Sequence, residues 1–277
     1  MKKYNFLHSA LSSANAFMST NDAVAWIREQ NRKISVKVER INFDDLKLWS
    51  FTDNKDAIRH DTNKFFSIQG INIRTNWGNK NEWSQPIINQ PEIGYLGFIT
   101  KEINGIVHFL LQAKVEPGNV NYVQLSPTLQ ATKSNYTLAH KGKKPAYLDY
   151  FVNASPKEII LDQLQSEQGA RFLRKRNRNI IIKVEEDIEI LDNFIWLTLA
   201  QIKTLMNYDN LVNMDTRTVI SGIPFGDYDA KGFESLNLMT KNIEPSSIGY
   251  QLLKSTLLNN KGINSFDNIQ SFITQQK

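Results

Sequence analysis

The segment from residue 106 to 116 alternates apolar and polar side chains in a way that could present acid–base groups to a ligand. Successive side chains of a strand point to opposite faces, so His108, Lys114 and Glu116 would share one face. Histidine titrates near neutral pH and suits proton transfer. Lysine could stabilise a developing oxyanion or contact a phosphate, and glutamate could act as a base. The alternative is a solvent-facing strand whose polar groups have no chemical role. The apolar face would hold Val107, Phe109, Leu111, Ala113 and Val115.

The next predicted strand, at residues 119–128, is followed by a run of polar residues. Its members are Thr132, Lys133, Ser134, Asn135 and Tyr136. Hydroxyl, ammonium and backbone N–H donors in one loop can hold a diphosphate. We interpret the run as a binding loop, against the alternative of an ordinary polar surface loop.

Four further side chains are candidates for ligand binding. Trp49 could stack on a nucleobase, although packing in the core is nearly as good an explanation. Ser166 stands near the end of a predicted helix, where its hydroxyl could reach a ligand. Arg171 and Arg174 could contact phosphate, because the guanidinium fork matches phosphate oxygens.

Other polar residues carry weaker arguments. His60 could be a second histidine of the site, but a lone histidine is more often structural. Asp215 and Arg217 are interpreted as an internal polar pair without a catalytic role.

Composition narrows the class of protein. The chain has 277 residues, 41% hydrophobic and 22% charged, which is typical of a soluble globular protein. It has no cysteine, which excludes disulfides, thiolate nucleophiles and cysteine-bound metals. The N-terminal segment is too polar for a signal peptide, and no stretch is apolar enough to span a membrane.

The charge pattern disfavours nucleic acid as a partner. Net charge is +5, and the densest basic cluster is at Arg171–Asn179. Basic residues do not recur along the chain as a nucleic-acid surface requires. One local cluster is enough for a small anionic ligand such as a diphosphate.

The order of predicted elements indicates a mixed α+β fold. Asn104 and Gly105 predict a tight hairpin turn between strands at 94–102 and 106–116. The run Ser19-Thr20-Asn21-Asp22 predicts a helix N-cap. We expect helices at 9–30, 158–169 and 198–209, further strands at 36–41, 64–76, 119–128 and 179–187, and a short helix or turn at 44–51.

Several segments together resemble the NDP-hexose 2,3-dehydratases. The resemblance runs from about Trp26 to Pro224. It is carried by FFSIQGINIR, WSQPII, LGF, HFLLQAKVEPGN, VQLSPTLQATKSNY, QSEQGARF, KRNRN, WLTLAQIKTLM and VNMDTRTVISGIP.

The resemblance implies an activity and a fold. Members eliminate water across C2 and C3 of a dTDP-4-keto-6-deoxyhexose, without a metal or nicotinamide cofactor. They are cytoplasmic homodimers, and each chain has two tandem modules with a Nudix-like mixed sheet flanked by helices. The glutamate-rich box of Nudix hydrolases is absent from this sequence, which disfavours a hydrolase.

The resemblance also predicts the domain organisation. We expect a dehydratase module over residues 1–224, then a linker and the helical start of a truncated second module over 225–277. Residues 9–30 align with 255–276 without a gap. Their identical positions are Ser9, Leu11, Ser19, Ile27 and Gln30. Two functions stay open: a dehydratase, or a module that binds the nucleotide sugar without independent catalysis.

Overall fold

The computed structural model describes residues 4–13, 17–132, 144–223, 244, 246 and 274–275. Its helices are α1 (Tyr4–Leu11), α2 (Thr20–Lys33), the 3₁₀ helix η1 (Phe43–Asp45), α4 (Leu148–Val152), α5 (Leu199–Leu205) and α6 (Met214–Ser221). The strands are β1 (Trp49–Phe51), β2 (Ala57–His60), β3 (Ser67–Arg74), β4 (Glu82–Asn89), β5 (Gly94–Ile103), β6 (Ile106–Val115), β7 (Val123–Pro127), β8 (Leu129–Ala131), β9 (Ile159–Ser166), β10 (Arg176–Lys183) and β11 (Phe194–Thr198).

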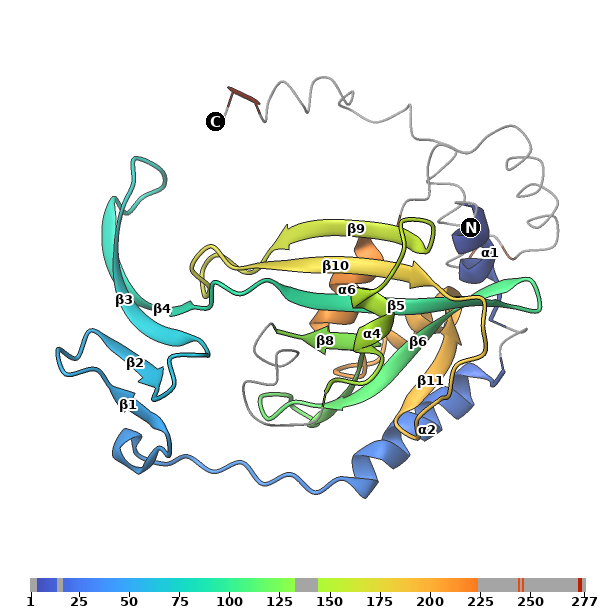
Figure 1. Ribbon diagram of the computed structural model, residues 1–277, viewed down its shortest axis with the longest axis horizontal. Coiled ribbons are helices and arrows are strands. Elements are labelled where there is room, and N and C mark those ends of the chain that lie inside the picture. The colour runs from blue at the N-terminus through green and yellow to red at the C-terminus, as the bar shows by residue number, and fades with distance from the viewer. Residues whose placement is uncertain are drawn as a thin grey trace.

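A seven-stranded mixed sheet forms the centre of the molecule (Figure 1). Its main strand order is β11-β6-β5-β10-β9, with β7 beside β6 and β8 beside β5. The β5–β10 pair is parallel and the other pairs of this sheet are antiparallel. The expected α+β fold with a mixed sheet flanked by helices is confirmed.

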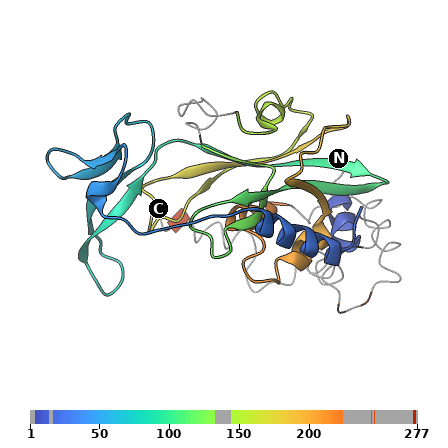
Figure 2. The ribbon, with the colours of Figure 1, turned by 90° about the horizontal axis from the view of Figure 1, so that it is seen from below.

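Both faces of this sheet are covered (Figure 2). Helices α1, α2, α5 and α6 pack on one face, where the core includes Phe109 and Leu111 of β6. Helix α4 covers the other face, where Phe151 packs near Leu110 and Ile180. The face of β6 that the sequence predicted to be polar therefore contributes to a second core, because Leu110 and His108 are both buried.

The hairpin of β5 and β6 opens into a fork. Asn104 and Gly105 have φ angles of 52° and 79°, so the predicted left-handed turn is confirmed. The two strands pair only near this turn, between Thr100–Ile103 and Ile106–Phe109. Beyond it β6 pairs with β7 and β5 pairs with β8.

Thr128, which joins β7 to β8, holds the fork at the point where β5 and β6 part. Its buried hydroxyl accepts a hydrogen bond of 3.0 Å from the Ile99 N–H and donates to the Leu110 carbonyl. A threonine hydroxyl can do both at once. The backbone groups freed by the split therefore find a partner inside the protein.

A four-stranded antiparallel sheet, in the order β1-β2-β3-β4, lies beyond one end of the large sheet (Figure 1). It is joined to the loop between β9 and β10. The Ile88 N–H donates to the Arg171 carbonyl at 2.8 Å, and the Leu173 N–H donates to the Ile88 carbonyl at 2.8 Å. Strand β4 leads directly into β5 and the large sheet.

The structure corrects two predicted elements. Residues 158–169 do not form a helix: Ile159–Ser166 is strand β9, paired along its length with β10. Short apolar runs fit helix and strand spacing equally well, and here the partner strand decides. Residues 36–41 form no strand.

The N-terminal prediction is confirmed in part. The helical stretch predicted at 9–30 divides into α1 and α2. Within the run predicted to cap a helix, Ser19 is the N-cap of α2 and forms a capping box with Asp22. The predicted start of a second module at 225–277 lies almost wholly outside the described residues.

Candidate functional site

A cavity of about 340 Å³ opens where β5 and β6 diverge. A smaller cavity of about 120 Å³ adjoins it and shares four of its lining residues, Leu96, Glu167, Asn177 and Asp215. We call these the main cavity and the side pocket. The main cavity is lined by Gln90, Gly94, Tyr95, Leu96, Lys114, Glu116, Gln130, Ala131, Thr132, Glu167, Phe172, Lys175, Asn177 and Asp215.

Glu116 reaches the main cavity just beyond the end of β6 and is held in place by two amides. The Gln130 Nε2 donates to its Oε1 at 2.8 Å, and the Asn119 Nδ2 donates to its Oε2 at 3.4 Å. The Gln130 Oε1 in turn accepts a hydrogen bond of 3.0 Å from the Asn213 Nδ2. A chain of side chains therefore links the end of β6, strand β8 and the start of α6.

Asp215 stands in the first turn of α6, directly after this chain. Asn213 is the N-cap of α6, and its Oδ1 accepts from the Thr216 N–H at 2.9 Å. Burial is the main cause that raises the pKa of Asp215 to about 6, and the negative charges of Glu167 and Glu116 raise it further. The positive charge of Lys114 opposes this shift. These interactions place the Asp215 carboxyl among the charged groups of the cavity.

Lys175 brings a second cation to the main cavity. Its side chain is buried, with 4% exposure, and its ammonium donates to the Glu92 carbonyl. Burial lowers the pKa of Lys175, while nearby Glu92 and Glu167 act in the opposite direction. Glu167 is fixed by the Asn177 Nδ2, which donates to its Oε2 at 2.6 Å.

This arrangement can move protons and bind an anion. A carboxyl with a pKa near 6 exchanges protons at neutral pH far more readily than an ordinary aspartate. Two lysines can neutralise a phosphate or a developing oxyanion. Among the described residues, no group of three or more histidine, aspartate or glutamate side chains is arranged to hold a metal ion.

Four of the candidate residues come together here. Lys114, Glu116 and Thr132 line the main cavity, and Ser166 lines the side pocket. Lys133, Ser134, Asn135 and Tyr136, which follow Thr132 in the chain, lie outside the described residues.

The arginine candidates and Trp49 lie elsewhere. Arg171 and Arg174 are exposed in the loop between β9 and β10 and do not line either cavity. Trp49 belongs to the small sheet, where its ring packs 4.8 Å from Phe66 and 5.4 Å from His60, centroid to centroid. These ring contacts lie within the small sheet, away from both cavities.

His108 is separated from Lys114 by the length of the strand. Six residues at about 3.3 Å each place them roughly 20 Å apart. His108 is 1% exposed, its Nδ1 lies 2.9 Å from the Ile106 carbonyl, and burial lowers its pKa. It lines neither cavity, so the predicted pairing of His108 with Lys114 on one ligand is not what the structure shows.

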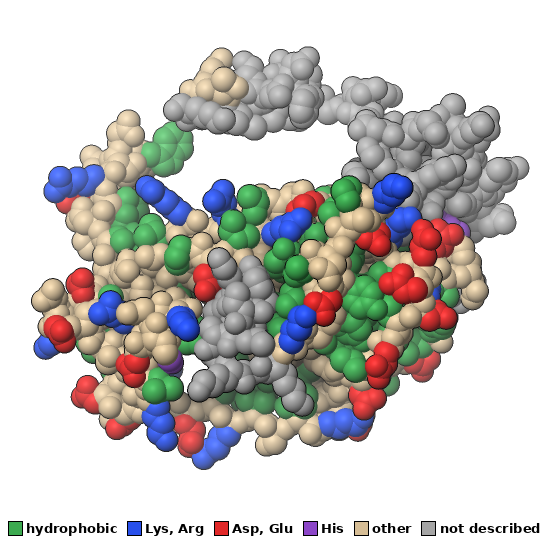
Figure 3. All heavy atoms as spheres, viewed as in Figure 1, with side chains coloured by type: hydrophobic (Ala, Val, Ile, Leu, Met, Phe, Trp, Pro, Cys, Tyr) green, Lys and Arg blue, Asp and Glu red, His purple; other side chains and the backbone are tan. Residues whose placement is uncertain are grey.

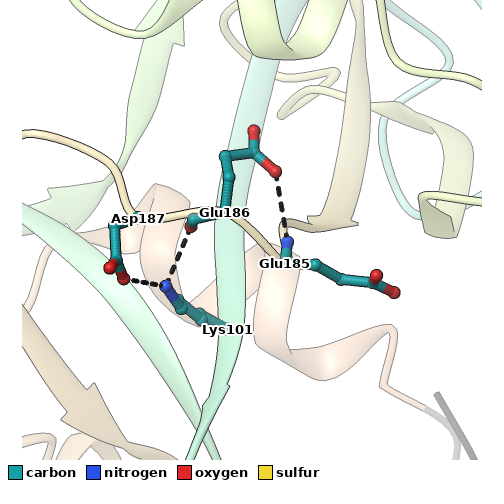
Figure 4. Close-up of polar contacts among 4 residues, drawn as sticks. All are labelled: Lys101, Glu185, Glu186 and Asp187. Atoms are coloured by element: carbon teal, nitrogen blue, oxygen red, sulfur yellow. Dashed lines mark hydrogen bonds and ion pairs between the residues drawn. The ribbon is translucent and has the colours of Figure 1, made fainter.

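The closed end of the hairpin, near His108, is occupied by structural contacts. Lys101 lies opposite His108 in the β5–β6 register. Its ammonium donates to the Glu186 carbonyl at 2.9 Å and pairs with Asp187 at 2.5 Å (Figure 4). These contacts tie the segment after β10 to β5, far from the main cavity.

The structure also revises the interpretation of Asp215 and Arg217. The guanidinium of Arg217 donates to the carbonyls of Val212 and Met206, at 3.2 and 2.9 Å, rather than to Asp215. The sequence pattern therefore did not place Asp215 in the cavity. It also missed Lys175 and Glu167, although the basic cluster at Arg171–Asn179 pointed to the right segment. Within that cluster the buried lysine, not the exposed arginines, faces the cavity.

The fold and the cavity define an α+β protein in which acidic and basic side chains line one cavity. A model of the NDP-hexose 2,3-dehydratase family matches residues 20–223. The chain belongs to this family.

Three similar proteins bear the name dTDP-4-dehydro-6-deoxy-alpha-D-glucopyranose 2,3-dehydratase. The one from Saccharopolyspora spinosa is 48% identical over 222 residues, which cover 80% of this chain and 46% of the relative. The relative from Amycolatopsis orientalis is 43% identical, over 84% of this chain and 50% of the relative. The relative from Streptomyces violaceoruber is 42% identical, over 72% of this chain and 45% of the relative. The chain thus spans about half the length of these relatives.

Similar solved structures include an ADP compounds hydrolase and an Ap4A hydrolase of C. elegans. The first is 10% identical with a TM-score of 0.36, covering 64% of this chain and 89% of that one. The second is 12% identical with a TM-score of 0.29, and the match covers 53% of this chain and 99% of that one.

Proposed function

We propose that the protein eliminates water across C2 and C3 of a dTDP-4-keto-6-deoxyglucose in deoxysugar biosynthesis, as a lyase. Family membership and the names of its relatives support the reaction. The observation that carries the proposal is the single cavity lined by Asp215, Lys114 and Lys175, in which burial raises the pKa of Asp215 to about 6.

The chemistry needs one group that moves a proton and one that stabilises charge. The C4 ketone acidifies the C3 proton, and the ionised Asp215 removes it to give an enolate. The same carboxyl, now protonated, gives that proton to the C2 hydroxyl as the C2–O bond breaks. The enolate electron pair forms the C2–C3 double bond and water leaves. The resulting enol becomes the 3-ketone, so the product is a 3,4-diketo-2,6-dideoxy sugar nucleotide.

The lysines would divide the negative charge of the ligand between them. Lys114 is close enough to Asp215 to influence its pKa, so it is placed to donate to the enolate oxygen at C4. Lys175, on the β9–β10 side of the main cavity, would contact the diphosphate. Glu116 and Glu167 keep the pKa of Asp215 high by their charge.

Deuterium exchange at C3 of the 4-keto sugar tests the first step alone. We expect the chain to incorporate solvent deuterium at C3, with a rate that rises with pH through about 6 as Asp215 ionises. Asp215→Asn should slow exchange by roughly 10²–10⁴-fold. Asp209→Asn, an exposed aspartate in the loop before α6, is the matched control and should exchange at the normal rate.

Two outcomes would contradict the proposal in different ways. If the chain binds dTDP but exchanges no deuterium, it is a nucleotide-sugar-binding module without independent catalysis. If it exchanges, and Asp215→Asn exchanges equally fast, the module is active but Asp215 is not the proton-transfer group.

The remaining proposals concern assembly and location. No helix in the described part of the chain is long and apolar enough to cross a membrane. On the face seen in Figure 3, Lys and Arg side chains are dispersed rather than gathered in one stripe. The dispersed basic side chains on this face disfavour nucleic acid as a partner. From the family resemblance we propose a cytoplasmic homodimer. Light scattering on the full chain and on a chain ending at Pro224 would measure the assembly, and a monomeric mass for the full chain would contradict it.

A further inference from the structure

Asn179, which lines the side pocket, carries a buried acceptor with no hydrogen-bond partner among the described residues. Asn179 of β10 is 0% exposed, and its Oδ1 hydrogen-bonds nothing in that part of the chain. Its Nδ2 donates to the Gln165 Oε1 on the neighbouring strand β9, which fixes the orientation of the amide. A buried carbonyl oxygen left without a donor destabilises the folded state, because it has lost its hydrogen bond to water. Such an atom in a cavity wall therefore suggests that a ligand supplies the donor.

The side pocket is larger than a single buried water requires. Its volume of about 120 Å³ far exceeds the roughly 10–15 Å³ that one water molecule needs. Its walls are mostly polar and include Ser166, Thr218 and Asp215. A compact ligand group with several hydroxyls fits such a lining.

Asp215 determines which end of a nucleotide sugar would enter. It lines both cavities, whereas Lys114 and Lys175 line only the main cavity. The reacting hexose must contact Asp215, with its C4 oxygen toward Lys114 where the two cavities meet, while the diphosphate must contact Lys175. The hexose therefore belongs in the side pocket, and the nucleotide extends through the main cavity.

We infer that the side pocket is a hexose subsite in which Asn179 recognises the C3 hydroxyl of the sugar. This inference rests on the proposed function. The carbonyl oxygen of Asn179 can accept a hydrogen bond but cannot give a proton. The C2 oxygen must receive a proton in order to leave, so an acceptor suits the C3 hydroxyl, which stays on the ring. Asn179 would be a specificity-determining residue that aligns C3 beside Asp215.

Calorimetry with unreactive ligands tests the subsite without any change to the protein. The probes are dTDP, dTDP-glucose and dTDP-glucose analogues lacking the C2 or the C3 hydroxyl. One neutral hydrogen bond corresponds to roughly 3- to 10-fold in affinity. We expect the 3-deoxy analogue to bind that much more weakly than dTDP-glucose, and more weakly than the 2-deoxy analogue.

Asn179→Ala then assigns the lost hydrogen bond to this residue. The variant should bind dTDP as the unchanged protein does, bind dTDP-glucose roughly 3- to 10-fold more weakly, and no longer discriminate against the 3-deoxy analogue. Asn72→Ala, an exposed asparagine of the small sheet, is the matched control and should retain all four affinities. A circular dichroism spectrum checks that both variants are folded.

The outcomes separate the inference from the proposed function. If the 3-deoxy analogue binds the unchanged protein as tightly as dTDP-glucose does, the subsite is overturned while sugar-nucleotide binding stands. If folded Asn179→Ala loses affinity for dTDP itself, Asn179 supports the nucleotide end and the inference is wrong. If the unchanged protein binds neither dTDP nor dTDP-glucose, the proposed function fails as well.

Discussion

Replacing Asp215 with asparagine should stabilise the protein at pH 8 while it removes the proton-transfer group. The ordinary pKa of this carboxyl is 3.8, and burial with nearby Glu167 and Glu116 raises it to about 6. At about 1.4 kcal/mol per pKa unit, holding the ionised carboxyl in the cavity costs roughly 3 kcal/mol at pH 8. Asparagine has the same shape without the charge, so most of that cost should disappear.

Two smaller effects reduce the expected gain. An anion in the first turn of a helix interacts favourably with the helix dipole, and its loss costs about 0.3–1 kcal/mol. The new amide must also find partners in the cavity. We therefore expect the free energy of unfolding to rise by roughly 1–3 kcal/mol at pH 8. For 150–250 residues, each kcal/mol corresponds to about 2–4 °C in Tm.

The pH dependence gives the sharper test, because its sign follows from the pKa shift. Well below pH 3.8 the carboxyl is protonated in both the folded and unfolded states, so the substitution does not change the free energy of unfolding through this charge. Between pH 3.8 and about 6 the folded state binds more protons, so the unchanged protein loses stability as pH rises. The gain of the variant should thus be small at pH 4, grow up to about pH 6 and be nearly constant above pH 7.

Urea unfolding at pH 4, 6 and 8 measures this difference for Asp215→Asn and the control Asp209→Asn. If Asp215→Asn is less stable than the unchanged protein at pH 8, the ionised carboxylate stabilises the fold and the reasoning from burial is refuted. A gain that does not change with pH would show that titration of Asp215 is not its source.

Three other substitutions test the fold and the placement of the site. Thr128→Val removes the hydroxyl at the fork and leaves the Ile99 N–H without its partner, so thermal unfolding should show a loss of roughly 1–3 kcal/mol. In Gly97→Ala a Cβ would stand 2.3 Å from the Phe151 ring, and we expect a loss of about 1–3 kcal/mol in urea unfolding; unchanged stability would mean that α4 can shift freely. His108→Gln should change deuterium exchange at C3 by less than a few-fold, because His108 lines neither cavity; a 10²-fold loss in a folded variant would restore it as a candidate.

Local sequence patterns predicted much of the large sheet. Asn104-Gly105 specified the hairpin because only a left-handed turn joins two strands so tightly, and Ser19 specified the start of α2. Strand β9 was missed because its apolar residues suit either spacing, and the choice was made by pairing with β10. The break between α1 and α2 was also missed.

The lining of the main cavity was predicted in part, and the reason lies in the way that β5 and β6 diverge. Lys114 and Glu116 were found because strand alternation places them on one face near the end of β6. The same alternation placed His108 with them, although it lies near the closed end of the hairpin. Periodicity along a strand shows which face a side chain occupies, but not where along its length a cavity opens.

The sequence by itself determined the family, the hairpin turn and which positions are apolar, because each depends on neighbouring residues or on matching segments. Only the tertiary structure decided that Asp215 of α6, Lys175 of the β9–β10 loop and Lys114 of β6 would line one cavity. These residues are far apart in the chain, and the splayed strands bring them together. The pKa of Asp215 is likewise a property of the assembled cavity, because desolvation and the charges of Glu167 and Glu116 act only after folding.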